Sequence, residues 1–142
     1  MPLAGLEKWH AYVKSHDRDA LWDLLHSDAV FESPVVHTPQ RGRDITFKYL
    51  ASAEKVLGGP GFIYRGEWRS ENGAVLEFEN EIEGIKLNGV DIITFDKEGR
   101  IVNFKVMVRP LKAINLLHRL MGEELMRQSE GVSAAKSHGS AR

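Results

Sequence analysis

The first half of the chain places its hydrophobic residues at helical spacing. Residues 3–15 and 17–25 each repeat apolar side chains every three or four positions, which predicts two helices, with Asp17 as the N-cap of the second. Residues 45–57 follow the same pattern and predict a third helix, which ends at Gly58. We therefore expect three helices in the first half of the chain.

The remaining pattern is that of strands. Residues 29–33 are partly β-branched or aromatic and predict a first strand. From residue 62 onward hydrophobic and polar side chains alternate, and one face carries Phe62, Tyr64, Trp68, Ala74, Leu76, Phe78 and Ile82. A loop formed by residues 71–73 would pair Trp68 with Leu76 and keep the apolar residues together, so we predict that register.

Residues 90–95 and 100–108 predict a second hairpin, in which Phe95 pairs with Arg100. One face of this hairpin then carries Asp91, Ile93, Phe95, Val102, Phe104 and Val106. The opposite face is also largely apolar, with Val90, Ile92, Thr94, Ile101 and Met107. Because both faces need a cover, we expect helices on one side and a second copy of the chain on the other, which makes a homodimer through the sheet.

Helices followed by hairpins are typical of the α+β class. We expect a cone-shaped, curved antiparallel β-sheet packed against the three N-terminal helices, with a C-terminal helix over residues 111–128. Residues 1–128 would form this single domain. Residues 129–142 are small and polar without periodicity, so we expect a disordered tail there.

The composition narrows the classes of partner. The chain has 19 Lys+Arg against 20 Asp+Glu and a net charge of -1, so it lacks the basic excess of nucleic-acid-binding proteins. It contains no cysteine, which excludes disulfides and thiol nucleophiles and is consistent with a reducing cytoplasm, where we expect the protein. No apolar run reaches about 18 residues, so no membrane span is expected. The histidines lack metal-ligand spacing, and we predict neither a metal nor a cofactor.

Two local sequences carry a resemblance to a known family. HDRDALWDLLHSDAVFESPVV resembles the passage from two helices into the first strand, and GVDIITFDKEGRIVNFKV resembles the last hairpin, of the nuclear transport factor 2-like superfamily. The SnoaL-like and ketosteroid-isomerase-like branches are the most similar, over about Leu6 to Arg109. This resemblance implies a conical apolar cavity, usually in a dimer, that serves isomerisation, cyclisation, dehydration or ligand binding without chemistry.

The same resemblance points to three positions. Asp91 falls where steroid isomerases keep a protonated acid that donates a hydrogen bond, and we expect its apolar neighbours to raise its pKa. Ser33 falls where those enzymes have a proton-shuttling carboxylate, and Trp9 falls where they have an oxyanion-hole tyrosine. Because serine does not shuttle protons at neutral pH, we do not expect steroid isomerisation by that mechanism.

Two functional hypotheses remain open. In the first, a cofactor-independent isomerase, cyclase or dehydratase acts on a small apolar or cyclic ligand, with Asp91 as proton donor or base and His37 as its partner. The residues expected to line its site are Trp9, Trp22, Phe31, Ser33, Tyr49, Tyr64 and Phe104. In the second, the chain is a non-catalytic binding or dimerisation module with a degenerate active site. Asp91 is then a buried structural carboxylate, and His37 is a loop histidine bonded to the backbone.

Overall fold

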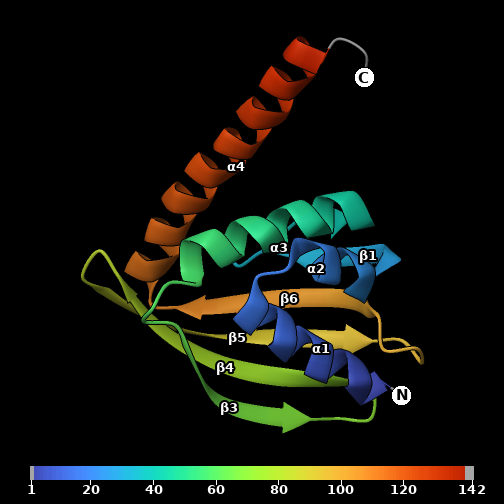
Figure 1. The fold of residues 1–142 in the computed structure, drawn as a ribbon. Coiled ribbons are helices and arrows are strands. Elements are labelled where there is room, and N and C mark those ends of the chain that lie inside the picture. The colour runs from blue at the N-terminus through green and yellow to red at the C-terminus, as the bar shows by residue number, and fades with distance from the viewer. Residues whose placement is uncertain (1, 140–142) are drawn as a thin grey trace.

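The computed structural model describes the backbone of residues 2–139 and the side chains of residues 3–128. In it, three helices cover one face of a curved six-stranded sheet, and a fourth helix leaves one end of that sheet (Figure 1). The helices are α1 (Pro2–Ser15), α2 (Arg18–Leu24), α3 (Arg43–Leu57) and α4 (Leu111–Gly139). The strands are β1 (Leu25–Glu32), β2 (Gln40–Arg41), β3 (Ile63–Arg69), β4 (Gly73–Ile82), β5 (Ile85–Phe95) and β6 (Ile101–Arg109). The predicted α+β architecture is confirmed.

Local capping groups set the boundaries of the helices. Asp17 caps α2 as predicted, because its side chain accepts hydrogen bonds from two backbone N–H groups of the first turn. Gly42 precedes α3 with a φ of 117°, a conformation that favours glycine. Gly58 ends the same helix and bonds its N–H to the carbonyl of Glu54. Helix α3 packs against β1, while α1 lies across β4 and β5.

The sheet is mixed and runs in the order β2-β1-β6-β5-β4-β3. Strands β3 to β6 form the expected antiparallel meander, but β1 pairs with β6 in the parallel sense. Tight hairpin loops impose antiparallel pairing on the meander. No such loop joins β1 to β6, so their relative direction could not be read from the turns. Strand β2, which the sequence pattern did not predict, pairs with β1 and forms the edge of the sheet.

The predicted register of the first hairpin is wrong. Trp68 pairs with Val75 rather than with Leu76, and it is 59% exposed on the outer face of the sheet. A β-bulge between Tyr64 and Gly66 adds a residue to β3, so the alternation changes phase at that point. Tyr64 therefore faces the helices, while Trp68 faces away from them.

The second hairpin keeps most of its predicted inner face but not its register. Phe95 pairs with Ile101 instead of Arg100, and a bulge beside Phe95 moves Asp91 opposite Val106. The residue opposite Asp91 differs from the predicted one by an even number of positions along β6. Because alternate residues of a strand share a face, Asp91 still faces the helices. Ile101 was expected on the outer face, but the bulge turns it inward and it is fully buried.

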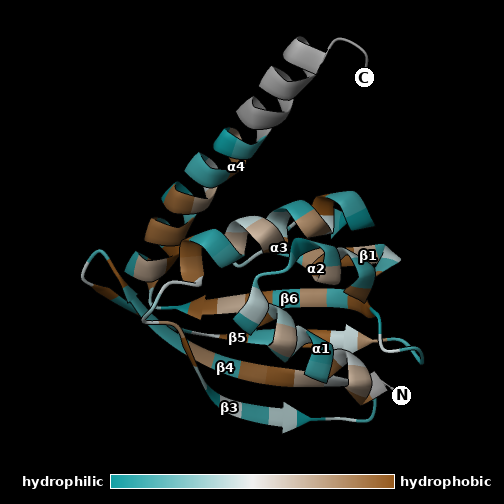
Figure 2. Ribbon diagram, viewed as in Figure 1, coloured by the Kyte–Doolittle hydropathy of each residue, from teal (hydrophilic) through white to brown (hydrophobic). Residues whose placement is uncertain are grey.

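Helix α4 begins after β6 as expected and continues to Gly139. Its backbone is helical over 129–139, the segment for which we predicted a disordered tail. Side chains beyond residue 128 lie outside the described residues, so the domain boundary at 128 stays a prediction. Hydrophobic residues concentrate in the first turns of α4 and along the central strands β4, β5 and β6 (Figure 2). Among the described residues, no helix is long and hydrophobic enough to span a bilayer.

Candidate active site

A cavity of about 220 Å³ lies between the helices and the concave face of the sheet. The sheet contributes Tyr64, Phe78, Asp91, Phe104 and Val106 to its wall, and the helices contribute Trp9, Tyr12, Val13, Leu50, Ala53, Glu54 and Leu57. Most of this lining is hydrophobic, so the carboxyl groups of Asp91 and Glu54 are exceptional. The volume is below the roughly 300–1,000 Å³ of drug-sized pockets and suits a compact molecule of one or two rings.

Three side chains form a relay of hydrogen bonds at the sheet wall. The indole Nε1 of Trp9 donates to the hydroxyl of Tyr64 over 3.1 Å, and that hydroxyl donates to Oδ2 of Asp91 over 2.6 Å. Both Trp9 and Asp91 are buried, at 5% and 7% exposure. The relay therefore fixes Oδ2 of the Asp91 carboxyl group and does not involve Oδ1.

The environment of Asp91 makes it an acid suited to neutral pH. Burial raises the pKa of Asp91 from 3.8 to about 7, while the hydrogen bond from Tyr64 acts in the opposite direction. Burial, followed by the nearby Asp91, raises the pKa of Tyr64 well above 10.0, so this tyrosine keeps its proton. Near neutral pH a large share of Asp91 is protonated and can donate a hydrogen bond or a proton.

A second polar group stands on the helix wall of the same cavity. The Tyr12 hydroxyl donates to Oε1 of Glu54 over 3.2 Å, and Nδ1 of His16 lies 3.0 Å from Oε2 of Glu54. Burial, with a further contribution from Glu54, raises the pKa of Tyr12, so it too remains a donor. Glu54 and His16 both line the cavity. The predicted site did not include any of these three residues.

A second cavity, also of about 220 Å³, contains another part of the predicted site. Phe31, Ser33 and Tyr49 line it together with residues from α4. Phe31 stacks on Tyr49 with ring centroids 5.2 Å apart. The Ser33 hydroxyl accepts hydrogen bonds from the backbone N–H groups of the two residues after Pro34, so it stabilises its own turn. The predicted ligand-binding residues thus divide between two neighbouring cavities.

Trp22 and His37, both predicted as site residues, line neither cavity. The guanidinium of Arg43 lies 4.2 Å from the centre of the Trp22 ring, so this tryptophan is used in packing. His37 is exposed beside Lys105 and Met107, on the outer side of β6. The structure therefore places His37 and Asp91 on the lining of different pockets.

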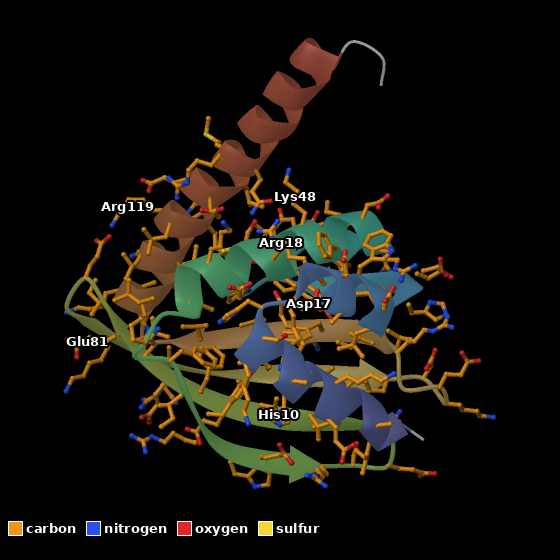
Figure 3. The ribbon with its side chains drawn as sticks, in the orientation of Figure 1. His10, Asp17, Arg18, Lys48, Glu81 and Arg119 are labelled. Atoms are coloured by element: carbon orange, nitrogen blue, oxygen red, sulfur yellow. The ribbon has the colours of Figure 1, made fainter. Side chains whose placement is uncertain are left out.

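His10 supports the relay from outside the cavity. It extends from α1 toward β3 (Figure 3), where its Nε2 lies 2.8 Å from Oε1 of Glu67. Its ring meets Tyr64 edge-on, with centroids 5.8 Å apart. Within the part of the chain that the structure describes, no three acidic or histidine side chains are grouped closely enough to hold a metal ion.

Comparison with known proteins identifies the family of this chain. A model of the SnoaL-like domain matches residues 6–104, which is most of the folded chain. The chain belongs to the SnoaL-like family. No curated protein matches it at a significant level.

Solved structures resemble this SnoaL-like chain over nearly its whole length. A steroid delta-isomerase from Pseudomonas aeruginosa is 34% identical, with 94% of this chain and 95% of that one covered and a TM-score of 0.77. A protein with a cystatin-like fold from Silicibacter pomeroyi DSS-3 is 26% identical, with 91% and 90% covered and a TM-score of 0.81. A de novo designed protein with a curved β-sheet, 18% identical with a TM-score of 0.63, shares the fold alone.

Three residues of this SnoaL-like site were not predicted, and the sequence carries only a weak signal for them. Tyr12 and Glu54 lie on helices. The spacing of apolar residues predicts which face of a helix is buried, but it does not predict which element packs against that face. His16 follows α1 with a φ of 58°. That conformation turns its ring toward Glu54, and nothing in the local sequence predicts it.

Proposed function

We propose that this SnoaL-like domain binds a small, largely apolar and cyclic molecule bearing a carbonyl oxygen, and acts on it by acid/base chemistry without a cofactor. The ligand would occupy the cavity beneath α1 and α3. Its carbonyl oxygen would lie at Asp91, which donates a proton or a strong hydrogen bond to it. The rings would contact the aromatic lining.

The environment of Asp91 is the observation that supports this proposal. Asp91 is a carboxyl group buried in an apolar cavity, with a pKa raised to about 7 and no salt bridge to a cation among the described residues. An ordinary structural carboxylate would be paired with a positive charge or left in water. A neutral carboxyl group instead matches a neutral acceptor such as a carbonyl oxygen.

The similarity to a steroid delta-isomerase supports a cyclic substrate. The site differs from the arrangement that the resemblance implied, because Ser33 bonds to its own loop and lines the second cavity. Trp9 does not act as an independent donor to the ligand but donates to Tyr64. We therefore propose the class of chemistry and leave the steroid itself out of the proposal.

Two probes of nearly equal shape test this function. 1-Indanone carries a carbonyl group, whereas indane does not, and both are small enough for the cavity. Below the pKa of Asp91, we expect 1-indanone to bind about fivefold to tenfold more tightly than indane, which corresponds to one net hydrogen bond. NMR titration of each probe measures this preference.

Asp91→Val should abolish the preference while still binding indane, because valine preserves the strand but donates nothing. Asp28→Val, at an exposed position on β1, is the matched control and should keep the preference. Binding of neither probe by the natural protein, or an unchanged preference in Asp91→Val, would overturn the proposed function.

We also propose that a second copy of the chain covers the outer face of the sheet. Val90 and Met107 pair there, close to Ile92, and Met107 is 51% exposed. Trp68, which the bulge in β3 turns outward, adds a large exposed aromatic surface. Such a surface is typical of an interface and uncommon on a monomer.

A further inference from the structure

We propose that Glu54 is the proton acceptor of this cavity, so that Glu54 and Asp91 act as base and acid on opposite walls. This inference rests on the proposed function, since it assigns the second half of the same chemistry. It also narrows the substrate class to carbonyl compounds with a removable C–H proton beside the carbonyl group.

Glu54 places a second carboxyl group on the lining of the cavity that contains Asp91. Glu54 comes from α3 on the helix wall, whereas Asp91 comes from β5 on the sheet wall, and both line the same cavity. A flat molecule held between the two walls would therefore present opposite faces or edges to the two groups. The oxygen of such a molecule meets the acid and its neighbouring carbon meets the base.

One hydrogen bond and one close polar contact hold the Glu54 carboxylate in place. Tyr12, which is 1% exposed, donates to Oε1, and His16 contacts Oε2 at 3.0 Å. The backbone N–H of His16 also bonds to the carbonyl of Tyr12 over 2.8 Å, which ties His16 to the end of α1. A base held in this way needs little reorganisation to meet the substrate.

The other titratable groups of the cavity are less suited to accept the proton. The pKa values of Tyr12 and Tyr64 are both raised, so both tyrosines hold their protons. Asp91 is committed to the carbonyl oxygen. Nδ1 of His16 lies 3.0 Å from Oε2 of Glu54, so we assign His16 as the residue that positions the carboxylate.

The resulting step balances without an oxidant, a reductant or a cofactor. Glu54 removes a proton from the carbon beside the carbonyl group, and the electron pair of that C–H bond forms a carbon–carbon double bond. The carbonyl π pair moves to oxygen, which takes the proton of Asp91. The product is an enol, with Glu54 protonated and Asp91 ionised. Return of the proton from Glu54 to the same carbon, with the enol O–H proton passing back to Asp91, restores the ketone. Where a further carbon–carbon double bond is conjugated with the enol, Glu54 can instead deliver the proton to the far carbon of that bond. This moves the double bond, and the enol oxygen again returns its proton to Asp91.

Deuterium exchange of 1-indanone tests the base directly. In D₂O, the protons beside the carbonyl group are replaced only when a base removes them, and proton NMR follows their loss. We expect the natural protein to accelerate this exchange above the buffer rate. Glu54→Gln keeps an oxygen to accept from Tyr12 but cannot take up a proton, so we expect it to slow the protein-catalysed exchange by about 100-fold or more.

A merely structural role for Glu54 would change binding, so the affinity for 1-indanone is measured beside the rate. We expect Glu54→Gln to bind 1-indanone within about twofold of the natural protein, because the carbonyl group is held by Asp91. Glu98→Gln, an exposed position in the loop between β5 and β6, is the control and should exchange at the natural rate. His16→Asn, which tolerates the same backbone conformation, should give an intermediate rate.

The possible outcomes separate this inference from the proposed function. If 1-indanone binds with its Asp91-dependent preference but exchanges at the buffer rate, or exchanges equally fast in Glu54→Gln, the role of Glu54 is overturned and the proposed binding role stands. If 1-indanone does not bind, the proposed function fails and the role of Glu54 fails with it. Loss of exchange in Glu54→Gln with binding retained supports both.

Discussion

At Asp91, burial and hydrogen bonding act in opposite directions on one carboxyl group. Burial in an apolar wall favours the neutral form, whereas the Tyr64 hydroxyl, itself held by Trp9, stabilises the anion. The balance leaves the pKa at about 7, where small changes in the surroundings shift the protonation state. The chemistry of the site therefore depends on the exact partners of this residue.

Removing the Tyr64 hydroxyl should raise the pKa of Asp91 further. Tyr64→Phe deletes the hydrogen bond that stabilises the carboxylate but keeps the ring in the cavity wall. Carbon-13 NMR of the aspartate carboxyl groups measures the shift. Tyr49→Phe, in the second cavity, should leave the pKa unchanged. An equal or lower pKa in Tyr64→Phe would contradict the assigned role of the hydroxyl.

The raised pKa of Asp91 also predicts how stability depends on pH. Between 3.8 and about 7 the folded protein holds a proton that the unfolded chain has lost. The contribution of Asp91 to the free energy of unfolding is therefore complete below this window and is lost as the pH rises through it. Relative to Asp91→Asn, which does not titrate, the natural protein should lose on the order of 2–4 kcal/mol between about pH 4 and about pH 8. Urea denaturation of both proteins at the two pH values measures this, and a constant difference would contradict it.

Of the two carboxyl groups in the site, the position of Asp91 could be predicted from the sequence, whereas that of Glu54 could not. Asp91 interrupts an apolar strand face, so the alternation along the strand predicts that it faces inward. A shift of the strand pairing by an even number of residues does not change that face. Glu54 lies on a helix rich in polar residues, where a glutamate is normally exposed to solvent. Its cavity position depends on how α3 packs over the sheet, which the pattern of one helix does not determine.

At the scale of elements, β-bulges explain most differences between the predicted and observed strands. The bulge in β3 turns Trp68 outward, and the bulge beside Phe95 turns Ile101 inward. The elements and their order could be predicted because their periodicity is long and regular. An added residue breaks the alternation without leaving a distinct local signal, so the faces beyond it could not be predicted.

The contact between α1 and the loop after β5 can be tested at Gly5. A Cβ atom there would overlap the backbone oxygen of Gly99 and the ring of Phe95, so Gly5→Ala should lower the free energy of unfolding by about 1–3 kcal/mol. It should also weaken binding of 1-indanone, because α1 carries Trp9. Gly122→Ala is the helical control with open space around it and should stabilise by up to about 1 kcal/mol. Thermal unfolding of both variants measures the effect, and a neutral Gly5→Ala would contradict the close packing.

For the whole molecule, the curved sheet separates two environments. Helices α1 and α3 lie over its concave face (Figure 1), where the cavity is found. Its outer face carries the exposed side chains of Trp68 and Met107. Apolar residues on both faces of β5 and β6 predict that both faces are covered. The sequence could not indicate which face would carry the cavity, since that depends on the side to which the helices fold.

Assembly through the outer face can be tested at Met107. We expect a dimer by native mass spectrometry, and we expect Met107→Lys to shift it to monomer, because a charged side chain would be buried against the second copy. The exposed position limits the effect on the fold itself. Met126→Lys, on the exposed side of α4, should remain dimeric. A natural protein that is monomeric at micromolar concentration would contradict this assembly.

The most direct test of the account is the pKa of Asp91 in the natural protein, measured by carbon-13 NMR with Asp91→Asn used to assign the resonance. A buried acid that serves a carbonyl ligand requires a value of about 7, and this is the result that we predict. A value near 3.8 would mean that the carboxylate is ionised throughout the neutral range. Asp91 would then be a structural anion, and the proposed acid would not exist.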